Sequence, residues 1–459
     1  MNNYKQSSTA INIILERMRQ HGNQPAIFWK DKEYTYSQLN VMIKNWQDRL
    51  ENEFNIKKRE VCGILGDFSP EVIALFYALM LKKCIIVPFT KQISSQVEEF
   101  KEISGVQCIF TMEDDDGCSF ERYQEVPQAA LIRQFRKDRD APGLVVFTSG
   151  STGKPKGILQ DCERVMKKFV VERKGWRMIL FLMFDHFGGI NTMFSAFAYG
   201  GVAVCISDRS CEEVGKMIER SKATLLPTTP TFLNLLIISG IYRQFDLSSI
   251  KLITYGTEVM PESLLQKIGE IFPNAKLKQT YGLSELGVLR SKSLSDDSPW
   301  VKIGGEGFDI KVIDKILWVK SESAMVGYLN APSPYDDEGW MCTGDQVEID
   351  GDYLKILGRK SEMINVGGQK VFPQEVEAVI AEANNITNVT VFGVPHPLMG
   401  QLVHAKVSLN KLEARRELSE RLRKFCQKRL TKYKIPVRFI IVSDETQRSA
   451  RYKKVRVNP

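Results

Sequence analysis

The feature that most constrains the fold is a regular alternation of short apolar runs with helical segments. The apolar runs have the length of strands and end at Gly, Pro or polar residues. They occupy residues 61–68, 83–89, 106–110, 143–148, 178–184, 201–207, 223–228 and 251–256. Helical segments such as 69–81 and 210–221 lie between them. Continuous apolar strands separated by helices indicate parallel sheets covered on both faces, so we expect an α/β fold.

Polar stretches divide this pattern at three places, residues 135–143, 291–300 and 358–363. After the third, new strand and helix patterns begin and continue to the end of the chain. A chain of 459 residues is long enough for more than one domain. We predict a large N-terminal α/β region with parallel or mixed sheets covered by helices, residues 1–357, and a small α+β C-terminal domain, residues 358–459.

The charge and cysteine patterns exclude several classes of protein. The net charge of +8 favours anionic partners such as nucleotides, coenzyme A or an acidic carrier protein. Basic residues concentrate only at 415–434, where they fit the solvated face of an amphipathic helix, so we do not expect nucleic-acid binding. The nine cysteines form no CxxC pair and their number is odd, which favours structural thiols over a disulfide framework.

Hydropathy gives no sign of a membrane protein. The longest apolar stretch, 72–81, is followed at once by Lys82 and Lys83, well short of the ~18 apolar residues that a membrane-spanning helix needs. The first twenty residues lack the apolar core of a secretory signal and contain charged residues. We therefore expect a cytoplasmic protein without a membrane span.

The segment 144–157, LVVFTSGSTGKPKG, carries the clearest chemistry. An apolar strand leads into glycines and hydroxyl residues, and Lys154 and Lys156 close the loop. Glycines let backbone N–H groups approach phosphate oxygens, hydroxyls add donors, and lysines offset negative charge. A Walker A loop is excluded because Thr148 replaces its first glycine and Pro155 replaces its Ser or Thr. The segment therefore predicts a different kind of polyphosphate site.

The TSGSTGKPKG sequence resembles the signature loop of the adenylate-forming superfamily, which includes acyl- and aryl-coenzyme A synthetases, luciferases and the adenylation domains of nonribosomal peptide synthetases. Further similar segments follow in chain order: YGTE at 255–258, YGLSELG at 281–287, GYL at 327–329, DDEGWMCTGD at 336–345, GRKSEMINVGGQKVFPQEVE at 358–377 and VFGVPHPLMGQ at 391–401. The resemblance covers the chain from about residue 140 onward and is looser before it. It is closest to stand-alone acyl-coenzyme A ligases.

The resemblance implies a nucleotide site made from several of these segments. The residues expected at the β- and γ-phosphates of ATP are Thr148, Ser149, Gly150, Ser151, Thr152, Gly153 and Lys154. The residues expected beside the adenine and the adenylate are Gly256, Thr257, Glu258, Tyr281 and Gly282. Ser284 is expected near the α-phosphate or the acyl carboxylate, and Glu285 is the expected magnesium ligand, because a carboxylate suits a hard cation.

Three more residues complete the implied site. Asp345 is expected to accept hydrogen bonds from both ribose hydroxyls, for which a carboxylate has enough acceptor sites. Arg359 is expected at the ribose or phosphate. Lys454 is the expected catalytic lysine, whose ammonium would offset charge between the attacking carboxylate and the α-phosphate. Lys453 stands where the family has glycine, so Lys453 remains the alternative for the catalytic lysine.

The family rotates its small domain between the two half-reactions, and the resemblance implies the same here. Ser361, followed by Glu362, replaces the usual Asp or Lys at the pivot. Gly367 and Gly368 of the VGGQKV loop would then approach the pantetheine chain during thioester formation.

The acyl pocket is expected at FLMFDHFGGINTM, residues 181–193. His186, Phe187 and Gly188 are its expected substrate-contacting residues, with His186 as a wall of the pocket; a core histidine is the alternative. Asp185 is ambiguous, because amino-acid-activating relatives use an aspartate near this place. The glycines at 188 and 189 would leave room for a flat or long acyl group.

These residues together predict an enzyme that uses ATP and Mg²⁺ to convert a carboxylic acid to acyl-AMP and pyrophosphate, then transfers the acyl group to a pantetheine thiol. The acceptor is coenzyme A or, alternatively, an acyl or peptidyl carrier protein. A binding protein of the same fold that has lost catalysis is the alternative of another class. The departures from the family at Lys453 and Ser361 favour this alternative, whereas the presence of Lys154, Glu285 and Asp345 counts against it.

Overall fold

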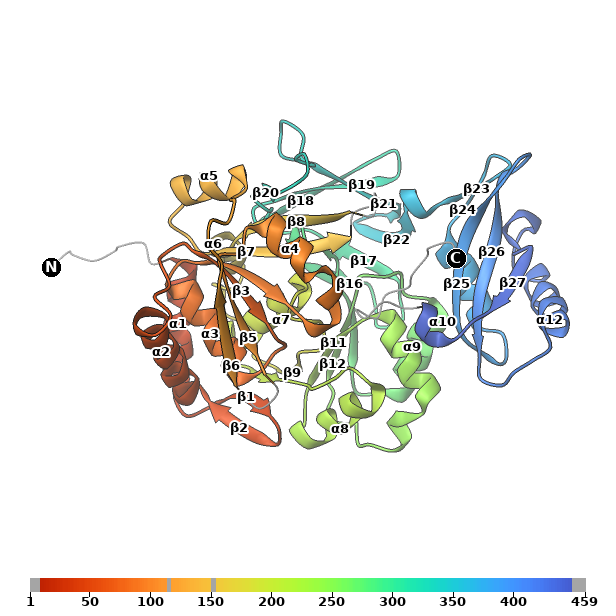
Figure 1. The fold of residues 1–459 in the computed structure, drawn as a ribbon. Coiled ribbons are helices and arrows are strands. Elements are labelled where there is room, and N and C mark those ends of the chain that lie inside the picture. Colours follow the sequence, from red (N-terminus) through yellow and green to blue (C-terminus); the bar gives the residue numbers. More distant parts are fainter. Residues whose placement is uncertain (1–8, 114–116, 150–153, 448–459) are drawn as a thin grey trace.

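The computed structural model describes residues 9–113, 117–149 and 154–447. Its N-terminal region contains two large mixed sheets (Figure 1). The first is parallel except for the strand at one edge, and the second has a parallel centre with antiparallel pairs at both edges. The strand order of the first sheet is β13 (Lys276–Gln279), β12 (Leu252–Tyr255), β11 (Leu225–Thr228), β9 (Arg177–Ile179), β10 (Val202–Val204), β1 (Pro25–Trp29) and β2 (Lys32–Thr35). The order of the second sheet is β20 (Gly327–Tyr328), β8 (Pro155–Asp161), β7 (Gly143–Ser149), β4 (Ile85–Phe89), β3 (Val61–Leu65), β5 (Cys108–Met112) and β6 (Cys118–Arg122).

Helices cover both faces of both sheets. The helices whose buried residues join the core cluster between the sheets are α1 (Ala10–Gln20), α2 (Tyr36–Asn52), α3 (Pro70–Leu81), α6 (Cys162–Lys167) and α7 (Phe187–Ala198). The outer faces are covered by α4 (Val97–Ser104) and α5 (Ala130–Asp138) on the second sheet, and by α8 (Cys211–Ser221), α9 (Pro230–Ser239) and α10 (Glu262–Ile271) on the first. The α/β prediction is confirmed, and the apolar strands predicted from the sequence are all present.

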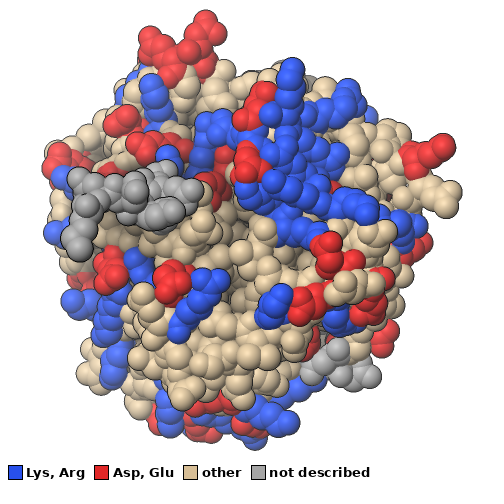
Figure 2. All heavy atoms as spheres, turned by 90° about the vertical axis from the view of Figure 1, so that its left-hand side faces the viewer, with Lys and Arg blue, Asp and Glu red and all other residues tan. Residues whose placement is uncertain are grey.

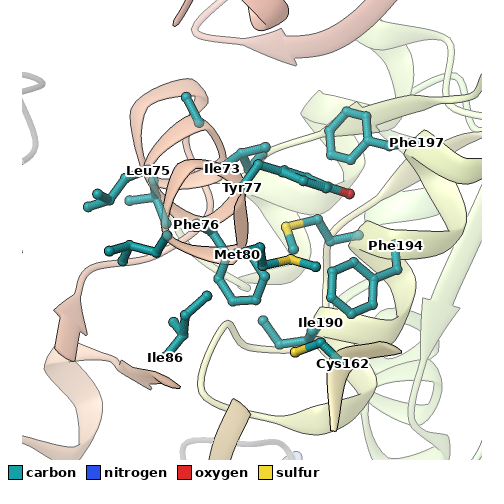
Figure 3. Packing of buried hydrophobic residues seen from close by; sticks show 14 of the residues in the cluster. Ile73, Leu75, Phe76, Tyr77, Met80, Ile86, Cys162, Ile190, Phe194 and Phe197 are labelled. Carbon is teal, nitrogen blue, oxygen red and sulfur yellow. The ribbon is translucent and has the colours of Figure 1, made fainter. Parts of the chain in front are cut away.

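Two of the predicted helices show why their sequences are helical. The second predicted helical segment forms α8, and the Ser210 hydroxyl accepts a hydrogen bond from the Glu213 amide at 3.1 Å, as its capping pattern indicates. Helix α3 begins with Ser69 as its cap and has Pro70 in its first turn. Nearly all of α3 is buried because it packs inside the central helical layer (Figure 3).

A third sheet and a short hairpin follow the two large sheets. The strand order of the third, antiparallel sheet is β16 (Ser291–Ser293), β17 (Trp300–Ile303), β22 (Tyr353–Arg359), β21 (Met341–Asp350), β19 (Ile316–Ser321) and β18 (Phe308–Ile313). The hairpin consists of β14 (Gly282–Leu283) and β15 (Gly287–Val288). The polar stretch 135–143 is not a joint between domains, because its end continues into β7 in the middle of the second sheet.

The last part of the described chain has a sheet and a core of its own (Figure 1). Its strands are β23 (Ile364–Val366), β24 (Gln369–Val371), β25 (Ile386–His396), β26 (Gly400–Leu409) and β27 (Arg438–Ile441), with helices α11 (Pro373–Ala381) and α12 (Arg415–Gln427). Helix α12 buries Leu418, Leu422 and Cys426 and exposes its basic residues, as the amphipathic pattern indicates. Strand β22 ends at Arg359, two residues past the proposed domain boundary.

Positive charge also gathers outside the C-terminal helix. Figure 2 shows Lys and Arg side chains close together over part of one face of the molecule. Lys58, Arg59 and Lys83 all pair with Asp140.

Within the described residues all nine cysteines are free, and six of them are buried. None of the helices in this part of the chain has the length and apolar character needed to cross a membrane.

Candidate active site

Asp345 stands at the centre of the candidate site because two segments distant in sequence meet there. Asp345 on β21 is the cross-strand partner of Arg359 on β22, and the Arg359 Nε lies 3.4 Å from its carboxylate. The Tyr281 hydroxyl donates a hydrogen bond of 2.5 Å to the Asp345 Oδ2. The β21–β22 hairpin and the segment before β14 thus bring together three residues that the sequence places at the nucleotide.

Burial controls the protonation of this group. Asp345 is 6% exposed and Tyr281 8% exposed. Burial raises the pKa of the Asp345 carboxyl above its ordinary value, and the Arg359 guanidinium acts in the opposite direction. Burial and the neighbouring Asp345 charge also raise the pKa of the Tyr281 hydroxyl, so Tyr281 stays a hydrogen-bond donor.

The YGTE segment follows β12 and turns sharply beside the same group. A Cβ atom on Gly256 would lie 2.6 Å from the Thr280 carbonyl oxygen, so only glycine fits there. Thr257 has a positive φ of 68°. The Glu258 carboxylate accepts hydrogen bonds from the amide (3.1 Å) and hydroxyl (2.7 Å) of Thr231 in the first turn of α9. These contacts fix the backbone that is expected to border the adenine.

A cavity of about 620 Å³ connects these parts. Thr257, Glu258, Tyr281, Gly282, Asp345 and Arg359 all line it. Glu362 and Gln374, which are hydrogen-bonded to each other at 2.9 Å, contribute to its wall from the C-terminal side. The cavity therefore lies where the N-terminal region meets the C-terminal part, and its volume is typical of small-molecule sites.

The expected phosphate loop is the turn of the β7–β8 hairpin. Thr148 and Ser149 end β7, Lys154 is exposed just before β8, and Thr148 pairs with Lys156 across the hairpin. Residues Gly150, Ser151, Thr152 and Gly153 lie outside the described residues. A strand follows the loop where a Walker A loop would have a helix, in agreement with the exclusion of that motif.

Glu285 is linked to this hairpin through Tyr328. The Tyr328 hydroxyl donates to the Glu285 Oε1 at 2.7 Å, and β20, which carries Tyr328, pairs with β8. The Lys156 Nζ lies 5.0 Å from the centre of the Tyr328 ring. Glu285 itself stands in the turn between β14 and β15, not at a helix start. The structure thus brings the expected metal ligand beside the expected phosphate loop.

Sequence reasoning missed the residues that make these links. Tyr328 belongs to the GYL segment at 327–329, to which the sequence assigned no role. Asn330 bridges β8 by accepting from the Gly157 amide at 3.0 Å and donating to the Pro155 carbonyl at 2.9 Å. The Gln160 side chain donates to the Ser284 carbonyl. Their sequence signal is only their place in or near a family segment, because the contacts join residues 43 to 175 positions apart.

The expected acyl-pocket residues have structural roles in this fold. His186 caps α7, and its Nδ1 accepts a hydrogen bond from the Gly188 amide at 3.0 Å. Phe187 is buried. A Cβ on Gly189 would lie 2.1 Å from the Met183 carbonyl oxygen, so close backbone packing explains this glycine instead of room for a substrate. His186, Phe187 and Gly188 line neither the nucleotide cavity nor the second cavity described below, and their contact with substrate stays a prediction.

The glycines of the VGGQKV loop, expected to act in thioester formation, lie apart from the cavity. Gly367 and Gly368 form the exposed turn between β23 and β24, both with positive φ, and they do not line the cavity. Ser361 lies in a short 3-10 turn, Lys360–Glu362, that directly follows β22. Lys453 and Lys454 lie outside the described residues, so their register stays open.

The residues present fit ATP with a magnesium ion. Tyr328 occupies one oxygen of Glu285, which leaves the other for a cation. Among the described residues there is no cluster of three or more acidic, His or Cys ligands. A single carboxylate agrees with Mg²⁺, which takes most of its other ligands from phosphates and water when it binds with a nucleotide.

Comparison with known proteins gives the family. The family model for AMP-binding enzymes matches residues 14–329, more than half of the chain. The chain belongs to the AMP-binding enzyme family. The model of the family's C-terminal domain matches residues 375–453. Neither match covers 330–374, so the domain boundary proposed at 357/358 falls between them.

Named relatives and solved structures agree with this membership. The 2-succinylbenzoate–CoA ligase of Bacillus subtilis (strain 168) is 25% identical over 488 residues, covering 97% of this chain and 96% of the relative. The indoleacetate–CoA ligase of Aromatoleum aromaticum is 25% identical, and the match covers 93% of this chain and 92% of the relative. The fold is similar to o-succinylbenzoate CoA synthetase from Bacillus subtilis in complex with its acyl-adenylate intermediate, with a TM-score of 0.78, 23% identity and 97% of both chains covered.

Family membership confirms the adenylate-forming resemblance, the fold class and the interpretation as an AMP-forming acid–thiol ligase. The roles of the individual residues remain predictions from the geometry described above.

Proposed function

We propose that this family member activates a small carboxylic acid with ATP and transfers the acyl group to coenzyme A. The observation that carries this proposal is the Tyr281–Asp345–Arg359 group at the wall of a 620 Å³ cavity. Relatives named as coenzyme A ligases support the acceptor. A cytoplasmic location is proposed on the composition alone.

The first half-reaction joins the acid to the α-phosphate. A carboxylate oxygen forms a bond to the α-phosphorus, and the bond to the leaving pyrophosphate breaks. Asp345 accepts from the ribose hydroxyls and Arg359 holds its carboxylate in place, so the nucleotide is oriented before reaction. Lys154 and Lys156 offset phosphate charge, and Lys454 offsets charge at the attacking carboxylate. Mg²⁺ held by Glu285 supplies further charge neutralisation at the phosphates.

The second half-reaction transfers the acyl group to sulfur. The coenzyme A thiol loses its proton, its sulfur bonds to the acyl carbon, and AMP leaves with the electrons of the broken acyl–oxygen bond. Gly367 and Gly368 lie outside the cavity in this conformation, so the C-terminal part has to rotate for the VGGQKV loop to reach the thiol.

A carrier protein is the alternative acceptor. Such proteins are acidic, and the basic residues gathered on the face in Figure 2 suit an acidic partner. A catalytically inactive binding protein is disfavoured because Glu285 and Asp345 sit within an intact network of partners.

Two assays test the proposal. Acid-dependent exchange of labelled pyrophosphate into ATP, run over a panel of aryl, fatty and amino acids, should identify at least one substrate. Thioester formation from that substrate should then be faster with coenzyme A than with a holo carrier protein. Absence of exchange with every acid would contradict adenylation, and exchange without acylation of either thiol would contradict only the second half-reaction.

A further inference from the structure

A second cavity, of about 440 Å³, lies beside helix α7. One wall is a single face of the first sheet, where Pro227, Thr254 and Lys278 stand in register across β11, β12 and β13. The opposite wall is the face of α7 that carries Asn191 and Ser195, four residues apart. The neighbouring face of α7 packs its Phe194 and Phe197 against α3 (Figure 3). Polar α7 residues thus face a cavity inside an otherwise apolar layer.

The cavity is strongly positive. Its charged lining residues are Lys168, Arg173, Lys278, Arg290 and Glu306. Glu306 and Arg173 are exposed, whereas Lys168, Lys278 and Arg290 are partly buried. Within the described part of the chain none of the four cations forms an ion pair. Partly buried cations without a carboxylate partner are costly, which indicates that an anion compensates them.

Two of the cations are held in place while keeping donors available. The Lys168 ammonium donates to the Val288 carbonyl at 3.1 Å and to the Asn191 side chain, and an ammonium has a third N–H. The Arg290 guanidinium donates to the Lys168 carbonyl at 2.7 Å. Its Nε is buried and has no hydrogen-bond partner among the described residues. The site is therefore organised around donors, not acceptors.

The charges also repel one another. Burial, followed by the nearby Arg290 charge, lowers the pKa of Lys168 to about 7. Burial, followed by Arg173 and Arg290, lowers the pKa of Lys278. An anionic ligand would reverse both effects, because an opposite charge favours the protonated amines.

The cavity is placed to receive one end of the acid substrate. Thr280 lines both this cavity and the nucleotide cavity, and the next residue, Tyr281, bonds to Asp345. Beside its polar residues the lining also contains apolar side chains, among them Phe169, Met178 and Leu225. An acid that extends from the adenylate past Thr280 would therefore enter a cavity that offers both apolar contacts and cations.

We propose that this cavity binds a second carboxylate of the substrate, so that the acid activated by this enzyme is a dicarboxylic acid with an apolar middle. Lys168, Lys278 and Arg290 hold the second carboxylate, and Arg173 contributes from the rim. The inference rests on the proposed function, because it names the class of acid that the adenylating site takes.

The test compares matched acids that differ by one carboxylate. Suitable pairs are 2-succinylbenzoate with 4-oxo-4-phenylbutanoate, and α,ω-dicarboxylic acids with monocarboxylic acids of the same chain length. In acid-dependent pyrophosphate exchange the dicarboxylic acids should have a KM at least about tenfold lower, as expected for charge-assisted hydrogen bonds. Equal or lower KM values for the monocarboxylic acids would overturn the inference.

Variants locate the effect in the cavity. Lys278→Gln should raise the KM for the dicarboxylic acid about tenfold and leave the KM for ATP and for the monocarboxylic acid unchanged. Arg173→Gln, on an exposed segment, should act in the same direction more weakly. Lys276→Gln is the matched control, because Lys276 is an exposed lysine on the same strand that does not line the cavity. An equal effect of Lys276→Gln and Lys278→Gln would overturn the inference.

A binding measurement separates this inference from the proposed function. Dicarboxylic acids should raise the Tm of the parent, and Lys278→Gln should reduce that shift, even if no acid supports exchange. Exchange with monocarboxylic acids alone, without a Tm shift from dicarboxylic acids, would leave adenylation standing and contradict only the second-carboxylate site.

Discussion

At the scale of single residues, the Tyr281 hydroxyl donates a hydrogen bond to Asp345, and we propose that this bond prepares Asp345 for the nucleotide. Tyr281→Phe removes the 2.5 Å hydrogen bond and keeps the ring. The KM for ATP should rise roughly three- to thirtyfold, because a hydrogen bond to a buried carboxylate is lost. ATP-dependence of pyrophosphate exchange measures this. Tyr353→Phe on β22 is the control and should leave the KM for ATP unchanged; an unchanged value for Tyr281→Phe would remove the hydroxyl from the nucleotide site.

The terminal lysines give a second prediction at this scale. Lys454→Ala should abolish most acyl-adenylate formation and spare thioester formation from a preformed adenylate, because the ammonium offsets charge only in the first step. Single-turnover assays with acid plus ATP, and with synthetic acyl-AMP plus coenzyme A, separate the two. If Lys453→Ala has this effect and Lys454→Ala does not, Lys453 is the catalytic residue.

Lys168 gives a third prediction, on pH. Its pKa is lowered to about 7 from an ordinary 10.5, so between these values the unfolded chain binds more protons and stability rises with pH. Burial lowers this pKa most, followed by the Arg290 charge, and Arg173, Lys278 and Glu306 are the other charged residues that line the cavity. The Tm of the parent should therefore rise between pH 7 and 9.5, and Lys168→Met should reduce that rise by roughly a few degrees. Lys167→Met changes the exposed neighbouring lysine and should leave the slope of Tm against pH as in the parent. If neither variant changes this slope, the lowered pKa of Lys168 is contradicted.

At the scale of elements, the start of α7 depends on backbone packing. Gly189→Ala would put a Cβ 2.1 Å from the Met183 carbonyl oxygen, which cannot move as a side chain can. We expect it to lower the free energy of unfolding by at least ~2 kcal/mol, as strain in packed interiors does. Denaturant unfolding measures this change.

A matched glycine in another helix provides the control. A Cβ added to Gly269 in α10 would have no neighbour within 4 Å among the described residues, so Gly269→Ala should stabilise the protein by up to ~1 kcal/mol through helix propensity. Equal effects of the two substitutions would show that the tight approach to Met183 is not what requires glycine at 189.

At the scale of the whole molecule, the position of Gly367 and Gly368 outside the cavity supports the proposal that the two half-reactions use different domain arrangements. Gly367→Leu should leave pyrophosphate exchange largely intact and reduce thioester formation at least tenfold, because a bulky side chain would obstruct the pantetheine path. Its nearest contact in this conformation is the flexible end of Met399.

The control for this variant is Gly351→Leu. Gly351 also has a positive φ, of 55°, and open space around the position of a Cβ, but it lies in the β21–β22 turn. It should spare both half-reactions. Loss of pyrophosphate exchange in Gly367→Leu would contradict a role confined to the second step.

The α/β class, most strands and helices, and the segments that meet at the candidate nucleotide site could be predicted from the sequence alone. This is possible because strand runs, capping residues such as Ser210 and glycine-rich loops are local signals. The contacts that those segments make with distant parts of the chain could not be predicted from the sequence. Tyr328 and Asn330 act across strand pairings that join residues about 170 positions apart, and no local pattern records such a register.

Which polar residues share a cavity depends on how distant segments pack together. Lys168, Lys278 and Arg290 come from three separate segments and look like ordinary surface charges in the sequence. Packing of α7 against the first sheet, with Lys278 in register beside Thr254, turns them toward one enclosed space. Conversely, Gly189 looked like room for a substrate, but the fold fills that space with the Met183 carbonyl. Local sequence specifies conformation, whereas charge in a cavity and crowding at a glycine are properties of chain segments brought together by folding.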